Sequence, residues 1–180
     1  MRSILMAFAF LLSLNSCSIA QTDTMPSRIT DLESADQITQ NGDLSTGEIL
    51  SLDFADNSDV ACFPATRFYE FQGKHVFYRV DIPPKSVTTF TVSPKNKKDR
   101  INIYGFRMKQ GSDASPPNIS NVSCEAAYPK YVGTPKLSRS NKAQSIEFAA
   151  IQKSYTILIG VAGAKGVESG EFTLDIHTKR

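Results

Sequence analysis

Apolar and polar residues alternate with a period of two along most of the chain, as they do in half-buried β-strands. The clearest alternation spans 75–82, in which every second residue from Val76 to Ile82 is large and hydrophobic. The two prolines at 83–84 end this segment, because proline cannot donate a backbone hydrogen bond to a neighbouring strand. Alternation resumes at 88–93. We therefore expect two successive strands joined by a short proline turn.

Shorter alternations recur along the chain, separated by turns rich in glycine and proline. They span 49–54, 101–106, 146–148, 155–161 and 171–177. The aromatic stretch 61–73 is expected to be a short irregular strand. The connection 110–141 is longer than an ordinary loop and is either functional or structured in a way that the pattern does not show. Because helical periodicity is almost absent, about seven short strands predict an all-β protein, an antiparallel β-sandwich.

The N-terminal residues have the features of an export signal. A basic start precedes the apolar stretch 4–14, which is long enough for a signal peptide and too short to span a bilayer. The sequence Leu-Asn-Ser-Cys at 14–17 looks like the lipobox of a bacterial lipoprotein, so residues 1–17 would be the signal and Cys17 would carry the lipid. Alternatively, the small residues that follow form an ordinary cleavage site, and residues 1–20 are removed. We expect a lipid-anchored protein of the bacterial cell envelope; the alternative is a soluble periplasmic or secreted protein.

Charge divides the chain into an acidic front and a basic body. Residues 18–59 contain nine acidic residues and one arginine, whereas the chain from residue 60 onward contains eighteen basic and nine acidic residues. Because 18–46 is polar and has no sustained periodicity, we expect a flexible acidic tether there and one folded domain at 47–180. The tether either contacts a partner or folds loosely onto the basic domain. The basic turn at 94–100 has no aromatic residues among its charges, so we do not expect nucleic acid as a partner.

The three cysteines predict one disulfide bond. An odd number in an exported chain indicates that one cysteine has a separate role. If Cys17 is lipidated or removed, Cys62 and Cys124 remain, and an oxidising compartment favours their pairing. Closing this loop would stabilise the fold by roughly 4 kcal/mol in the chain-entropy model. The alternative is a pair of buried free thiols.

The acidic residues Asp53, Asp56 and Asp59 are candidate calcium ligands, since calcium takes six to eight oxygen ligands. Their spacing does not match an EF-hand loop, however, and clusters of Asp and Asn are ordinary turn formers. Neither histidine stands at ligand spacing from a cysteine. We therefore expect no metal ion or cofactor, with calcium as the weaker hypothesis.

No catalytic constellation is present in the sequence. The only histidines are His75 and His177, and the chain has no HExxH or GxSxG motif. We expect both histidines to be surface residues of strands and the protein not to be an enzyme. A hydrolase that uses carboxylates is the remaining enzymatic alternative.

Four aromatic residues are candidates for a ligand-binding surface: Tyr104, Phe106, Tyr128 and Tyr131. If exposed, they could stack on a sugar or pack against a peptide, because sandwiches carry function in sites added to their faces and end loops. The alternative is that these residues belong to the core or pack beneath loops.

The segments VFYRVDIP, TTFTVSP, INIYGF, SYTILIGVAG and GEFTLDI together resemble the bacterial pre-peptidase C-terminal domain, over residues 48–177. The resemblance implies a compact, jelly-roll-like β-sandwich with a non-catalytic accessory role outside the cytoplasm. It leads us to expect a module that binds a glycan, a peptide or a matrix protein. The alternative is a structural or partner-binding subunit of an envelope assembly.

The chain also departs from the pattern of that family. It has Arg-Ile-Asn-Ile-Tyr at 100–104 where the family often has an Asp-rich strand, and Lys153-Ser154 where a glycine usually stands. The two cysteines and the excursion at 110–141 are not features of the family. The resemblance therefore supplies no calcium-binding or collagen-binding residues for this chain.

Overall fold

The structure is a computed structural model that describes residues 26, 28–56, 62–63, 65–116, 118–119, 123–129 and 143–180. The proposed signal peptide and lipidation site at Cys17, together with Asp59 and Tyr131, lie outside the described residues. In the described part of the chain, no helix is long and apolar enough to cross a membrane.

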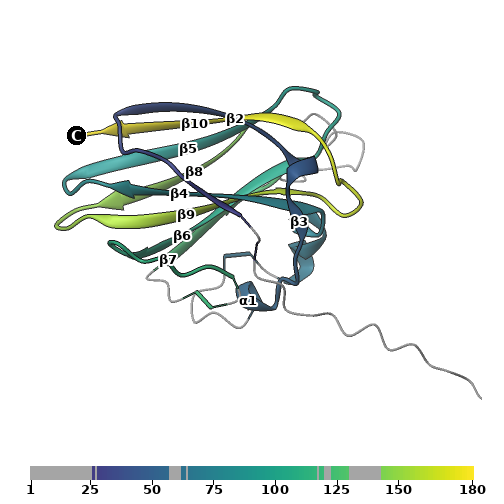
Figure 1. Ribbon diagram of the computed structural model, residues 1–180, viewed down its shortest axis with the longest axis horizontal. Helices are drawn as coiled ribbons and strands as arrows, with labels where there is room; N and C mark the ends of the chain where they lie inside the picture. Colours follow the sequence, from purple (N-terminus) through teal and green to yellow (C-terminus); the bar gives the residue numbers. More distant parts are fainter. Residues whose placement is uncertain are drawn as a thin grey trace, which may run out of the picture.

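The described chain forms two packed β-sheets (Figure 1). The strands are β1 (Ile29–Asp31), β2 (Gln37–Asp43), β3 (Glu48–Ile49), β4 (Lys74–Ile82), β5 (Ser86–Pro94), β6 (Ile101–Lys109), β7 (Ser123–Ala127), β8 (Gln144–Ala150), β9 (Tyr155–Gly163) and β10 (Glu171–Lys179). Sheet A has the order β1-β4-β9-β6-β7, with β3 also paired to β4, and sheet B has the order β2-β10-β5-β8. All pairs are antiparallel except β1 with β4.

Apart from the short strands β1 and β3, the strand order is that of a jelly roll. Eight strands remain, and the first, eighth, third and sixth form sheet B while the second, seventh, fourth and fifth form sheet A. This order follows from two interlocked Greek keys, in which the chain crosses repeatedly between the sheets. The predicted all-β, jelly-roll-like sandwich is therefore confirmed.

The main hydrophobic core lies between the two sheets. The alternating residues of β4 that the sequence singled out, among them Tyr78, Val80 and Ile82, point into it. Phe90 and Val92 of β5 face them from sheet B, with no exposed surface. The strands expected at 75–82 and 88–93 and the proline turn between them are confirmed.

A second, largely aromatic core covers the outer face of sheet A. It contains Tyr104 and Phe106 of β6 and Phe77 of β4, packed under the described residues of the segment 50–71, which are 50–56, 62–63 and 65–71. We call this covering segment the cap. The cap contains helix α1 (Asp53–Asp56) and the 3₁₀-helix η2 (Ala65–Phe71). In Figure 1, α1 lies below sheet A, on the side away from sheet B.

The strands expected at 49–54 and 61–73 are therefore wrong. Only Glu48–Ile49 pairs with a neighbouring strand, and the next residues leave the sheet edge. Leu50, Leu52 and Phe54 are all buried in the second core. These apolar residues pack against the outer face of sheet A, and they do not form one face of a strand.

The disulfide between Cys62 and Cys124 is confirmed, with Cα atoms 5.0 Å apart. It joins the cap to β7, and both cysteines pack against the second core. The covalent link therefore holds the cap against the outer face of sheet A.

The domain begins earlier than the sequence indicated. The segment expected to be a flexible tether, 18–46, contains β1 of sheet A and β2 of sheet B, so the boundary expected at residue 47 is wrong. Both are edge strands with mostly polar side chains, which weakens the alternation that reveals a strand. Acidic residues of this segment pair with the body of the domain: Asp31 with Arg79 at 2.6 Å and Asp36 with Arg180 at 3.2 Å.

Candidate binding groove

The aromatic candidates from the sequence do not form an exposed surface. Tyr104 and Phe106 have no exposed surface, so of the two alternatives the structure supports the one in which they belong to a core. They lie on the outer face of sheet A, which would be solvated in a bare sandwich, but here the cap covers it. Tyr128 is half-buried beside the same core, with the Arg67 guanidinium 5.6 Å from its ring centroid.

His75 is also buried, with 2% of its surface exposed, so its expected surface position is wrong. Its Nε2 lies 2.7 Å from the Phe71 carbonyl oxygen and its Nδ1 lies 2.8 Å from the Tyr104 hydroxyl. A carbonyl oxygen can only accept, so Nε2 carries the proton and Nδ1 accepts from Tyr104. Burial lowers the pKa of His75 to about 4 and raises that of Tyr104 well above its ordinary value. Both ring nitrogens are engaged, which leaves neither available to a substrate. His177 is exposed on β10.

The acidic candidates do not form a described metal site. Among the residues that the structure describes, no group of three or more His, Cys, Asp or Glu side chains is placed to hold a metal ion. Asp53 is exposed at the start of α1, and Asp59 and the side chain of Asp56 lie outside the described set. The calcium hypothesis thus stays an untested prediction.

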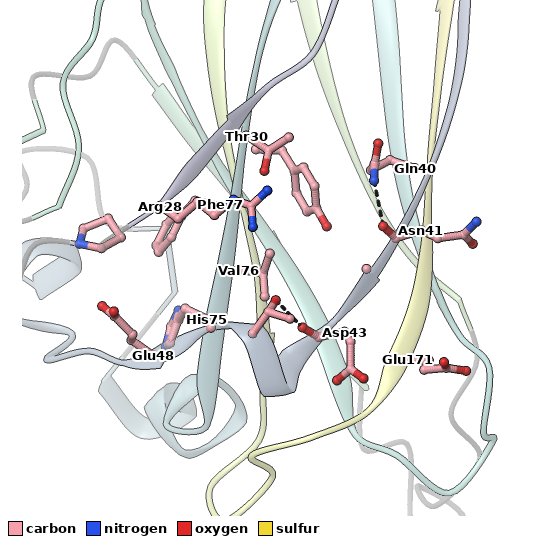
Figure 2. Close-up of a pocket in the computed structure, with 15 residues that line it drawn as sticks. Arg28, Thr30, Gln40, Asn41, Asp43, Glu48, His75, Val76, Phe77 and Glu171 are labelled. Carbon is pink, nitrogen blue, oxygen red and sulfur yellow. Dashed lines mark hydrogen bonds between the residues drawn. The ribbon is translucent and has the colours of Figure 1, made fainter.

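A groove of about 400 Å³ opens at one edge of the sandwich, between β2 of sheet B and β1 and β4 of sheet A (Figure 2). Its lining consists of Pro26, Arg28, Thr30, Gln40, Asn41, Gly42, Asp43, Thr46, Gly47, Glu48, His75, Val76, Phe77, Tyr78 and Glu171. We call it the edge groove. Figure 2 shows Arg28 and Thr30 on one side and Gln40 and Asn41 on the other, with Asp43 and Glu171 towards one end.

The floor of the edge groove depends on a glycine in β2. A Cβ atom at Gly42 would collide with the Tyr78 hydroxyl and the ring of Phe172. Glycine at this position therefore lets the Tyr78 ring stand between the sheets with its hydroxyl beside β2. Burial raises the pKa of Tyr78 to about 12, against the opposing effect of the Arg28 charge. The hydroxyl consequently stays protonated and can donate a hydrogen bond at physiological pH.

One end of the edge groove is acidic. Asp43 caps the 3₁₀-helix η1 (Leu44–Thr46), accepting from the Ser45 amide at 2.7 Å and from the Gly170 amide at 3.3 Å. The hydrogen bond from Ser45 holds the pKa of Asp43 below its usual range. Glu48 and Glu171 complete three carboxylates in the lining, against one guanidinium from Arg28. The lining therefore carries a net negative charge at neutral pH.

Sequence reasoning did not identify this groove. Its residues come from segments that lie far apart in the chain, 26–48, 75–78 and Glu171, and no motif joins them. The nearest available signal was Asp43 followed by Ser45, which is typical of a capped turn and would have placed structure inside the expected tether.

Two further hollows, of about 420 and 370 Å³, lie at a second place, around Asp81 and Ser34. There the Arg79 guanidinium donates a hydrogen bond to the Asp31 carboxylate. This bond raises the pKa of Arg79 and lowers the pKa of Asp31. Asp81 accepts a hydrogen bond from Thr156. Arg79, Asp31 and Asp81 thus already have partners within the fold.

No family model matches the chain, and no curated protein matches it. Solved structures similar to it include PliG of Aeromonas hydrophila, a periplasmic lysozyme inhibitor of g-type lysozyme, with 10% identity, 84% of this chain and 98% of that chain covered, and a TM-score of 0.40. Another is CorA of Methylomicrobium album BG8, a surface-associated copper-binding protein, with 8% identity, 84% and 98% covered, and a TM-score of 0.39.

The pre-peptidase C-terminal domain of collagenase from Bacillus anthracis is also among them, with 10% identity, 84% of this chain and 95% of that chain covered, and a TM-score of 0.37. The domain type that the sequence resembles is thus one of the solved structures to which the chain is similar.

Proposed function

We propose that this protein is an exported, non-catalytic binding module that holds an extended polypeptide segment of a partner protein in the edge groove. The signal-like N-terminus and the Cys62–Cys124 disulfide support export into an oxidising compartment. The observation that carries the proposal is the groove itself, which follows the edges of two strands and is lined by hydrogen-bonding groups. A polypeptide matches such a lining because it offers donors and acceptors at regular spacing along an edge.

The structure favours a polypeptide over a glycan. A sugar site generally needs an exposed aromatic platform, and the best candidates for one, Tyr104 and Phe106, are buried beneath the cap. Binding is favoured over catalysis because the only histidine in the groove lining, His75, has both ring nitrogens engaged inside the fold.

The test is selection of binders from a displayed library of random dodecapeptides, with a glycan array as the alternative probe. We expect peptides to be selected and to lose affinity for a Thr30→Phe variant, whose ring would occupy the groove. The matched control is Thr30→Ser, which keeps the groove open. Absence of any selected peptide, or equal affinity for both variants, would refute the proposed function, and specific glycan binding would replace it. Thermal unfolding of each variant checks that the fold is intact.

A further inference from the structure

The edges of the two sheets differ in how they are protected. Along β4, sheet A is covered by β1 and β3, and the Leu32 amide donates to the Arg79 carbonyl oxygen at 2.8 Å. At β8, the Arg107 guanidinium donates to the Ala149 carbonyl oxygen at 3.0 Å. Edge strands in natural proteins are commonly blocked by such contacts or by lysine and proline.

Within the described part of the chain, strand β2 is not covered by another strand on its outer side, and a local side-chain contact is what occupies one of its outward groups. It pairs with β10 on one side, and no described strand pairs with its other side. Its sequence, QITQNGD, contains no lysine or proline and is charged only at its last residue. As far as the described residues show, the outer side of β2 is therefore not paired with another strand.

The direction of the free backbone groups follows from the register with β10. The Thr178 amide donates to the Asp36 carbonyl oxygen, and the Leu44 amide donates to the Gly170 carbonyl oxygen. In an antiparallel pair, alternate residues turn their amide and carbonyl groups towards the partner strand. Even-numbered residues of β2 therefore bond to β10, and Gln37, Thr39 and Asn41 direct their backbone groups outward.

One of these outward groups is occupied by a side chain of the same strand. The Gln40 side-chain amide donates to the Asn41 carbonyl oxygen at 2.7 Å, as Figure 2 shows. The Gln40 side-chain amide therefore occupies the place from which the backbone amide of an added strand would donate to the Asn41 carbonyl oxygen. Because the bond is local and exposed, a partner strand can displace it at little cost.

Charge indicates which strand would fit. Asp43 and Glu171 lie at one end of β2 and Glu48 stands across the groove. The positive charge of Lys74 also acts on Asp43 and helps to lower the pKa of that carboxyl. The Lys74 ammonium group donates to the Ser45 carbonyl oxygen, however, and Lys74 does not line the groove. The β2 strand of a second copy of this chain, QITQNGD, contains no Lys or Arg to offer to these carboxylates. A Lys or Arg side chain of a different partner would be attracted to them.

We infer that the partner's segment adds to sheet B as a fifth strand along β2, with a Lys or Arg side chain directed to Asp43 and Glu171, which are opposite each other in the β2–β10 register. This inference rests on the proposed function and specifies its geometry. The added strand bonds to the outward groups of Gln37, Thr39 and Asn41, and its inward side chains enter the edge groove.

The test uses Thr39→Pro with Thr39→Ala as its matched control. Proline at residue 39 removes the backbone N–H group that points away from β10, and it leaves every hydrogen bond to β10 in place. An edge strand tolerates proline at a position where the amide faces solvent. The probes are the selected dodecapeptides, resynthesised with an N-methyl group at each position in turn, and with Lys or Arg replaced by Gln. Affinity is measured by fluorescence anisotropy, and folding by thermal unfolding.

We expect Thr39→Pro to weaken binding about tenfold or more and Thr39→Ala to leave it unchanged, because only the former loses backbone bonds. N-methylation should weaken binding at every second peptide position. Replacing the Lys or Arg of the peptide by Gln should lower its affinity for wild type, and it should lower its affinity for the Glu171→Gln variant by less. Strand addition is refuted, while the proposed function stands, if peptides bind and Thr30→Phe lowers their affinity but Thr39→Pro and N-methylation leave the affinity unchanged. Dimerisation of the protein through β2, abolished by Thr39→Pro, would also overturn the inference.

Discussion

Burial of His75 makes the stability of the fold sensitive to acid. The neutral ring donates to the Phe71 carbonyl oxygen and accepts from Tyr104, and burial lowers its pKa from 6.5 to about 4. Above pH 6.5 the ring is neutral in both the folded and the unfolded chain. Below that pH the unfolded chain binds a proton that the folded chain resists, so the free energy of unfolding falls.

The size of this effect follows from the pKa difference. A difference from 6.5 to about 4, at 1.36 kcal/mol for each pKa unit, gives a loss of about 3 kcal/mol. The loss begins near pH 6.5 and is complete just below pH 4. It is a large part of the stability of an ordinary domain, which is about 5–15 kcal/mol.

The assay is urea unfolding of wild type and His75→Gln between pH 7.5 and 3.5. Glutamine can donate and accept in the same cavity but does not titrate, so it should cost about 1–3 kcal/mol at neutral pH. Carboxylates with lowered pKa values, such as Asp31 and Asp43, also lose stabilisation in acid, but equally in both proteins. The stability advantage of wild type should therefore fall by about 3 kcal/mol towards pH 4, so that the variant becomes as stable as wild type or more stable. A constant difference, or an NMR titration of His75 near pH 6.5, would refute the assignment.

Three further outcomes are expected. Replacing Cys62 and Cys124 by serine should lower the free energy of unfolding by roughly 4 kcal/mol, measured by urea unfolding, while unchanged stability would show that the cap holds without its covalent link. Gly42→Ala should destabilise the fold by about 1–3 kcal/mol because of overpacking against Tyr78, and a thermal midpoint equal to wild type would contradict the packing described. Cys17→Ala should move the protein from the membrane fraction to the soluble exported fraction, and continued membrane association would refute the lipid anchor.

The sequence was a reliable guide where strands are central and a poor one where they lie at edges. The strands expected at 75–82 and 155–161 are confirmed because their side chains fill cores, which produces long apolar patterns. β1 and β2 were not expected, because an edge strand needs few apolar residues to hold its place. Its pairing depends on backbone bonds and on contacts such as Asp31 with Arg79, which link residues 48 positions apart.

The cap explains most of the wrong predictions about sites. Leu50, Leu52 and Phe54 have the spacing of a strand, but the outer face of sheet A offers them a larger apolar contact than pairing would. The same contact buries Tyr104 and His75. Alternation in a sequence reports which residues are apolar, and it does not report which of two surfaces they cover.

The distribution of buried surface also indicates where a partner can bind. Sheet A has cores on both faces, so neither face is open to a ligand. The outer face of sheet B carries short polar side chains that bond to each other across strands, such as Thr91 with Ser145 at 2.8 Å and Thr39 with Asp175 at 2.7 Å. Side chains that already bond to one another offer few groups to a ligand, which makes this part of the face a poor site for specific contacts. The edge beside β2 combines a hollow, backbone groups that point away from β10, and a lining with three carboxylates and one guanidinium, and for this reason we propose it as the binding site.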